Sequence, residues 1–129
     1  MSTRVLALDW GLKKTGVAVG EPGFPAQPLL AIDSTTRQKL LDEVGNLCLE
    51  HGVKTILIGL PPHPQNAQKV KKIKELLEDK GYKVVLWEET LTSIKAQNQL
   101  RQSAHSKKSI AKHIHSTAAA LMLEEYLGT

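Results

Sequence analysis

Two acidic residues in this sequence stand at the ends of short apolar stretches that are typical of buried strands. Asp9 ends the stretch 4–9, and Glu89 closes the stretch that begins at residue 83. If helical crossovers bring these strands into one sheet, both carboxylates emerge at the same edge and repel each other unless a cation lies between them. Mg²⁺ and Mn²⁺ prefer such oxygen ligands, and they activate water for attack on a phosphodiester. Without a cation, Asp9 would cap a turn and Glu89 would favour the start of a helix.

Basic side chains accompany this pattern and indicate a polyanionic partner. The formal net charge is +4, and the stretch 90–123 contains no acidic residue. Lysines near a phosphate backbone supply an affinity that does not depend on sequence and that falls with salt. The lysines that we expect to contact nucleic acid are Lys13, Lys14, Lys107, Lys108 and Lys112. Trp10 and Trp87 lie near the two acidic strand ends, where each can stack on a base or, as we expect, anchor the core.

The length of 129 residues, 41% of them apolar, fits one compact domain that spans 1–129. No run approaches the roughly 20 apolar residues that a membrane span requires, so we expect no membrane contact. The N-terminus shows no cleavage site of a secretory signal, and the single cysteine, Cys48, cannot form an internal disulfide. These features predict a cytoplasmic protein. A homodimer is left open, since an exposed strand or a Lys-rich helix would serve one.

The elements that must position the two acids follow from hydrophobic periodicity and from turn residues. Predicted strands span 4–9, 15–20, 29–33, 54–60 and 83–87. Predicted helices span 35–52, 65–80, 92–102 and 109–127, with a basic loop at 105–108. Thr35 and Gln38 have the spacing of a capping box, which predicts Thr35 as the cap of the first helix. The inner face of the last helix is predicted to include Ile110, Ile114, Leu121 and Met122.

The order of these elements predicts the fold class. The first strands are joined by short turns and form an antiparallel hairpin region, whereas the later strands are joined through helices and form βαβ crossovers. The result is an α/β fold with a mixed five-stranded sheet flanked by helices. This is the order of the RNase H-like fold.

Four segments resemble, in the right order, the motifs of the YqgF family, the RuvC-like Holliday-junction resolvases. The segment 7–20, which opens Ala-Leu-Asp-Trp-Gly, resembles the start of that family, and Ile-Gly-Leu-Pro at 58–61 resembles its second motif. Glu-Glu-Thr-Leu-Thr-Ser at 88–93 is similar to its acidic strand end. The segment 115–127 resembles its C-terminal helix. The resemblance therefore covers essentially the whole chain.

The resemblance implies an RNase H-like endonuclease that depends on a divalent cation. In bacteria the family is associated with maturation of the 5′ end of 16S ribosomal RNA, after an earlier assignment to Holliday-junction resolution. The implied substrate is accordingly precursor rRNA or branched DNA. Asp9 matches the first metal-binding carboxylate of the family and Glu89 matches the second. The third acidic position falls on His115, so the implied catalytic set is Asp9, Glu89 and His115.

His115 leaves two interpretations open. Imidazole is a poor ligand of Mg²⁺ but an acceptable ligand of Mn²⁺, and it can act as a general base near neutral pH. Alternatively, the third ligand is lost, and the chain is a non-catalytic nucleic-acid-binding or ribosome-assembly module. The acid-free stretch 90–123 offers no replacement carboxylate nearby.

Overall fold

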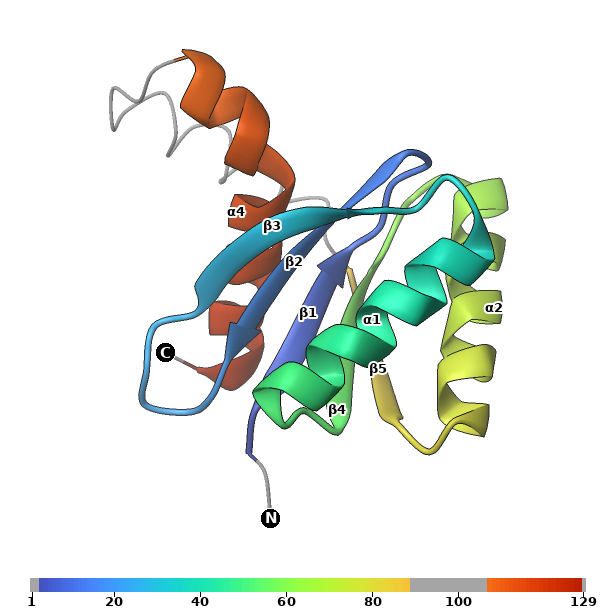
Figure 1. Ribbon diagram of the computed structural model, residues 1–129, viewed down its shortest axis with the longest axis horizontal. Coiled ribbons are helices and arrows are strands. Elements are labelled where there is room, and N and C mark those ends of the chain that lie inside the picture. The colour runs from blue at the N-terminus through green and yellow to red at the C-terminus, as the bar shows by residue number, and fades with distance from the viewer. Residues whose placement is uncertain (1–2, 89–106, 129) are drawn as a thin grey trace.

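This computed structural model describes residues 3–88 and 107–128, and of 107–115 it describes the course of the backbone alone. Within these residues, five strands form one sheet in the order β3-β2-β1-β4-β5 (Figure 1). The strands are β1 (Val5–Asp9), β2 (Lys14–Gly20), β3 (Gln27–Asp33), β4 (Thr55–Leu60) and β5 (Lys83–Glu88). The helices are α1 (Arg37–His51), α2 (Pro64–Asp79) and α4 (Lys107–Leu127).

The sheet is mixed, as the element order predicts. β1 pairs antiparallel with β2, and β2 pairs antiparallel with β3. β4 pairs parallel with both β1 and β5, because each of these connections crosses over through a helix. Helices α1 and α2 cover one face of the sheet and α4 covers the other (Figure 1). The predicted fold class is therefore confirmed.

The central strands are apolar throughout because both of their faces are covered. Leu8 and Ile58 pack into the cluster under α1 and α2, whereas Ala7 and Leu57 pack into the cluster under α4. Fully burying a side chain the size of leucine or isoleucine contributes about 1.5–3 kcal/mol relative to leaving it in water. Successive side chains of a strand point to opposite faces. The side of the sheet on which a residue at a strand end lies therefore follows from the cluster to which its neighbours belong.

Helix α1 begins one residue later than the capping-box spacing predicts. Its N-cap is Thr36, whose Oγ1 accepts a hydrogen bond from the Lys39 N–H at 3.2 Å. The backbone N–H and the hydroxyl of Thr35 instead donate to Asp33 Oδ1, at 2.8 and 2.6 Å. The prediction of Thr35 as the cap is wrong because Asp33, two residues earlier, captures its hydroxyl in a local turn. At the other end, Gly52 with φ 68° adopts the left-handed conformation and ends the helix, as predicted.

Helix α4 differs from its prediction at its start and in its buried face. It begins at Lys107, so the predicted loop 105–108 is wrong at Lys107 and Lys108. The alanine run 118–120 and Met122 are buried, as predicted, but Leu123 is buried and Leu121 is only half-buried. The predicted helix 92–102 lies outside the described residues, as do the side chains at 110 and 114. No helix in 3–88 or 107–128 is long and apolar enough to cross a membrane.

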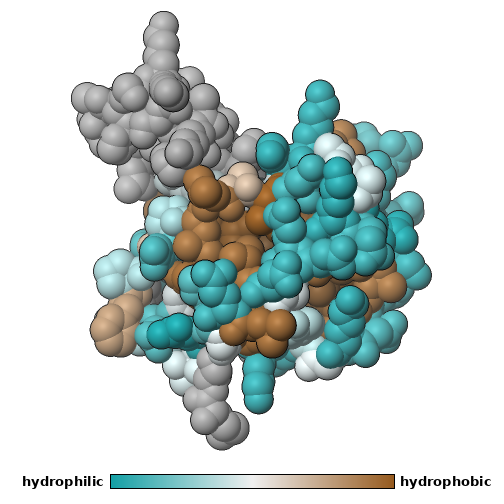
Figure 2. Space-filling view, viewed as in Figure 1, coloured by the Kyte–Doolittle hydropathy of each residue, from teal (hydrophilic) through white to brown (hydrophobic). Residues whose placement is uncertain are grey.

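Apolar side chains also reach the surface between β3 and α1. Figure 2 shows them gathered on the face where β3 passes beside α1. A groove of about 550 Å³ lies there, and Leu30, which lines it, is 63% exposed. This groove is on the α1 side of the sheet.

Candidate functional site

Asp9 is the last residue of β1 and lies where β1, β4 and β5 all end, an edge that we call the carboxyl edge. Among the acids that the structure describes, Asp9 alone is buried, with 7% of its surface exposed. Because side chains alternate along a strand, Asp9 shares the α4 face of the sheet with Ala7. A buried carboxylate costs free energy unless hydrogen-bond donors or a cation offset its charge. Its setting makes Asp9 the leading candidate for chemistry among the described acids.

The turn between β1 and β2 is held by contacts that only glycine at position 11 permits. A Cβ on Gly11 would overlap the carbonyl oxygen of Lys14. The Gly11 N–H donates to Thr15 Oγ1 at 3.4 Å, and the Ser34 hydroxyl donates to the Gly11 carbonyl oxygen at 2.6 Å. The Ser34 N–H also donates to the Lys13 carbonyl oxygen at 3.0 Å. These contacts fix the backbone that carries the exposed side chains of Lys13 and Lys14 next to the end of β1.

β4 separates β1 from β5 and has a glycine where these strands end. The register pairs Leu8 of β1 with Ile58 of β4, so the next residues of these two parallel strands are Asp9 and Gly59, and Gly59 pairs with Trp87 of β5. Gly59 places no side chain between the two outer strands. Glu88, the last residue of β5, falls by alternation on the face opposite to Asp9. Glu89 is the next residue and lies outside the described part of the chain, so its convergence with Asp9 stays a prediction.

Helix α4 runs along the sheet away from the carboxyl edge. Near that edge the Val17 N–H of β2 donates to Ser116 Oγ at 3.3 Å, where the pairing of β2 with β3 is irregular. Toward the other edge, the Ala26 N–H donates to Glu124 Oε1 at 3.3 Å. Position 115 therefore stands at the carboxyl edge, one helical turn before buried Ala119 on the same helix face. The side chain of His115 is outside the described residues, and its role stays a prediction.

Positive charge gathers at the carboxyl edge. α1 and α2 both begin there. Neither helix has an acidic residue in its first turn, so no acidic side chain of that turn offsets the positive end of its dipole. Exposed cations at the edge or in the first two turns of these helices are Lys13, Lys14, Arg37, Lys39 and Lys69. Lys107, Lys108 and Lys112 lie in the first two turns of α4, but their side chains are not described, so their contact with nucleic acid stays a prediction.

Asp33 is the acid that ends β3 at this same edge, and its charge is already engaged. The side-chain hydrogen bond and then the backbone hydrogen bond from Thr35 lower the pKa of Asp33, and Lys39 and Lys14 add to this effect. Lys39 Nζ lies 3.6 Å from Asp33 Oδ2. Asp33 therefore acts within its turn, unlike Asp9, and serves as a natural comparison for it.

The described part of the predicted metal site is a single carboxylate. Among the described residues there is no group of three or more His, Cys, Asp or Glu side chains placed to hold an ion. Of the predicted set Asp9, Glu89 and His115, only Asp9 has a described side chain. The carboxylate of Asp9, buried at a strand end beside Gly59, is the donor type that Mg²⁺ and Mn²⁺ accept. The described part of the set fits such an ion.

Several positioning residues were not singled out from the sequence. Gly59 and Ser116 both lie in segments that carry the family resemblance, but no local pattern assigns them a contact. The signal that could have identified Ser116 is its hydroxyl on a helix face that is otherwise buried and rich in alanine, because a buried hydroxyl is expected to have a hydrogen-bond partner. Trp87 packs edge-on against Tyr126, with ring centroids 5.9 Å apart at 87°, and thus anchors the core, as expected.

Comparisons with known proteins agree with this architecture. The family model described as "RuvX: Holliday junction resolvase" matches residues 3–129. A relative from Listeria innocua, named "Putative pre-16S rRNA nuclease", is 36% identical over 98% of each chain. A relative of the same name from Clostridium botulinum is 34% identical over 96% of each chain. The crystal structure of the fowlpox virus Holliday junction resolvase matches 97% of each chain with a TM-score of 0.64 at 12% identity, which shows the shared RNase H-like fold.

Proposed function

Since this chain belongs to the RuvX family of Holliday junction resolvases, the YqgF family, we propose that it is a nuclease that hydrolyses phosphodiester bonds in structured nucleic acid. Relatives at 34–36% identity over nearly the whole chain are named for precursor 16S rRNA. We therefore propose the 5′ extension of that RNA as the substrate, ahead of branched DNA. The observation that carries the proposal is the buried carboxylate of Asp9 at an edge otherwise rich in lysine side chains and helix N-termini.

The chemistry at this edge is proposed to depend on a divalent cation, Mg²⁺ or Mn²⁺. When bound, such a cation supplies a Lewis acid that activates water and stabilises the leaving oxygen. Asp9 and Glu89 are the residues that would hold it. Burial of Asp9 supports this role, since a carboxylate with little water around it attracts a cation more strongly than an exposed one. Gly59 supports it as well, because β4 places no side chain beside Asp9.

The other residues at this edge have proposed roles that do not involve binding the cation. Lys13 and Lys14, held next to Asp9 by the β1–β2 turn, attract the phosphate backbone toward the carboxylate. The proposed role of His115 is to accept or donate a proton near neutral pH, and the position of residue 115 in α4, directly before Ser116, supports this role. The proposal thus divides the edge into a carboxylate that binds a cation, lysines that hold the strand, and an imidazole that moves a proton.

Cleavage of a 5′-extended 16S rRNA fragment with Mg²⁺ or Mn²⁺ tests this proposal. We expect Asp9→Asn to lower the cleavage rate by roughly 100-fold or more, because several kcal/mol of charge stabilisation are lost. Asp33→Asn is the matched control, since Asp33 also ends a strand at this edge but engages Thr35 and Lys39. Cleavage by Asp9→Asn at the rate of Asp33→Asn would remove the nuclease role from Asp9.

The alternative, a binding module that has lost its third ligand, is tested with His115→Asp. Cleavage that appears or rises strongly in this variant would identify the natural chain as an altered nuclease. Cleavage that is present in the natural chain and lost in the variant would assign a working role to His115. RNA binding without turnover by either chain, with either cation, would favour the module.

A further inference from the structure

A cleft opens at the carboxyl edge, on the face of the sheet away from Asp9. It is a cleft of about 190 Å³ between the β1–β2 turn and the beginnings of α1 and α2. Arg37 and Lys69 line it from the two helices, and Trp10 and Leu12 line it from the turn. Trp10 packs against the core under α1 and α2 with part of its ring exposed, whereas Asp9, one residue earlier, faces α4. The cleft and Asp9 therefore lie on opposite sides of one strand end.

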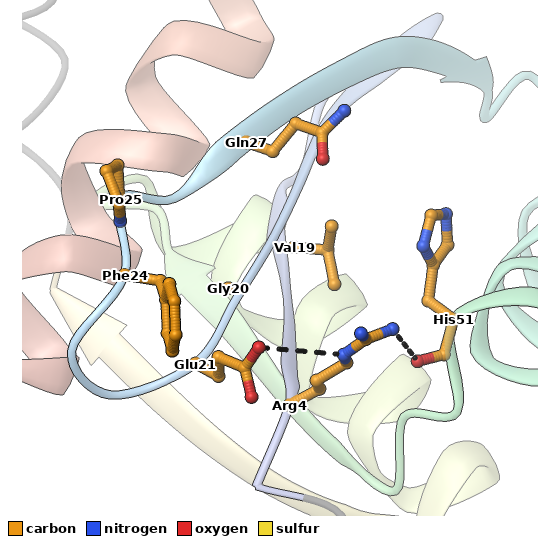
Figure 3. Close-up of a pocket in the computed structure, with 8 residues that line it drawn as sticks. All are labelled: Arg4, Val19, Gly20, Glu21, Phe24, Pro25, Gln27 and His51. Atoms are coloured by element: carbon orange, nitrogen blue, oxygen red, sulfur yellow. Dashed lines mark hydrogen bonds and ion pairs between the residues drawn. The ribbon is translucent and has the colours of Figure 1, made fainter.

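The charge of this cleft distinguishes it from a hollow of similar size at the opposite edge. Figure 3 shows that other cavity, of about 220 Å³, where Arg4 donates to the His51 carbonyl oxygen at 3.0 Å and lies 4.0 Å from Glu21. Its cation is thus already held by protein oxygens. The residues that line the cleft between α1 and α2 include two cations and no carboxylate. A cleft with this lining favours an anion.

The size of the cleft indicates part of a polymer rather than a free metabolite. Pockets for small molecules begin at roughly 300 Å³, and this cleft is smaller. Arginine presents a planar fork of donors that matches phosphate, and lysine adds a point charge. The exposed part of an indole ring stacks on any base or sugar regardless of sequence. One nucleotide of a nucleic-acid strand has both the charge and the flat surface that these side chains recognise.

We propose that the cleft binds one nucleotide of the substrate strand next to the cleaved phosphodiester, with Arg37 and Lys69 on its phosphate and Trp10 on its base or sugar. This inference rests on the proposed function, which assigns cleavage to Asp9. The strand then crosses the carboxyl edge, with the reacting phosphate on the α4 face and its neighbour on the α1 face. Lys13 in the turn and Lys14 at the start of β2 would then lie along this path.

The first test measures RNA affinity after removing single charges. A fluorescein-labelled, 5′-extended 16S rRNA fragment is titrated in EDTA with Arg37→Gln and Lys69→Gln, and its anisotropy gives Kd. The matched controls are Lys80→Gln, at the far end of α2, and Lys54→Gln, at the far edge of the sheet. We expect Kd to rise about tenfold for each cleft variant, because each loses a charged hydrogen bond, and about twofold at most for each control. Equal Kd values for cleft variants and controls would overturn the proposal.

A second measurement follows Trp10 directly, in a chain where it is the one tryptophan left. Trp87→Phe keeps a ring against Tyr126 and removes the second indole. Saturating RNA should quench the remaining emission of Trp10, and an unchanged spectrum would contradict its contact with the strand. If no fragment is cleaved but Kd still depends on Arg37 and Lys69, the cleft stands and the proposed nuclease fails. If cleavage occurs while cleft variants bind like the controls, the nuclease stands and the cleft fails.

Discussion

The hydrogen bond from the Val17 N–H to Ser116 Oγ yields a sharp prediction, because it joins α4 to the sheet near the carboxyl edge. Ser116 has no exposed surface, and the bond measures 3.3 Å. In Ser116→Ala the Val17 N–H loses this acceptor in a place that water does not reach. An unsatisfied buried amide is costly, so the free energy of unfolding must fall although the substitution removes only one oxygen atom.

The expected size of the effect follows from two opposing terms. Leaving a buried donor without its partner costs about 1–3 kcal/mol. Alanine is a better helix former than serine, which returns about 0.5 kcal/mol. We therefore expect Ser116→Ala to lower the free energy of unfolding by about 0.5–2.5 kcal/mol and Tm by roughly 2–10 °C.

Urea denaturation followed by circular dichroism checks this value. Thr117→Ala is the matched control, because it removes a hydroxyl from the neighbouring, half-buried position of the same helix. We expect the control to change the free energy of unfolding by no more than about 0.5 kcal/mol. If the two variants proved equally stable, the bond would contribute nothing to stability, and the reasoning that Ser116 satisfies a buried amide would be refuted.

Three further predictions concern other parts of the fold. Gly11→Ala should lower the free energy of unfolding by about 1–3 kcal/mol, because its Cβ meets a backbone carbonyl. Gly45→Ala, in a helix with open space around this position, should raise the free energy of unfolding by about 0.5–1 kcal/mol. Urea denaturation measures both changes, and changes of the same sign would contradict this prediction. Burial raises the pKa of the Cys48 thiol from 9.0 to about 11, so at pH 8 its thiolate fraction is about 100-fold lower than that of an ordinary thiol. Alkylation of Cys48 in the folded chain should therefore be at least about 100-fold slower than alkylation of an ordinary exposed thiol. Thr35→Val removes the side-chain hydrogen bond that lowers the pKa of Asp33 most. A lowered pKa stabilises the fold above the unfolded pKa, and this effect is lost as the pH falls through the folded pKa, so the variant should be less stable than the natural chain at pH 7 and the difference should shrink as the pH falls below 3.8. A stability difference of the same size at every pH would contradict this origin.

Much of the fold was predictable because its signals are local. The apolar run of β4 and the helical spacing in α1 each depend on residues within a few positions of one another, and both elements were predicted within one or two residues. The order of elements then restricts the sheet to few topologies, since crossovers between parallel strands have one hand. The placement of Asp9 at a strand end was likewise predictable, because the apolar run of β1 stops at this residue.

Local rules failed where two neighbouring residues compete for one role. Thr35 and Thr36 both qualify as a helix cap by residue type, and the position of Asp33 decided between them. Leu121 and Leu123 both carry apolar side chains, and only packing on the sheet showed that Leu123 is the more deeply buried. In the first case a contact within a local turn selects the cap, and in the second case packing against the sheet selects the buried residue.

The sequence by itself determined the candidates for chemistry: an acid at the end of a strand, an imidazole in the last helix, and lysines between the first two strands. Only the tertiary structure decided what lies beside them. The bond between Val17 and Ser116 joins residues 99 positions apart, and one cleft is lined by both Arg37 of α1 and Lys69 of α2. Backbone hydrogen bonds and side-chain periodicity act within a few residues, whereas such meetings depend on how whole elements pack, and no short stretch of sequence records that packing.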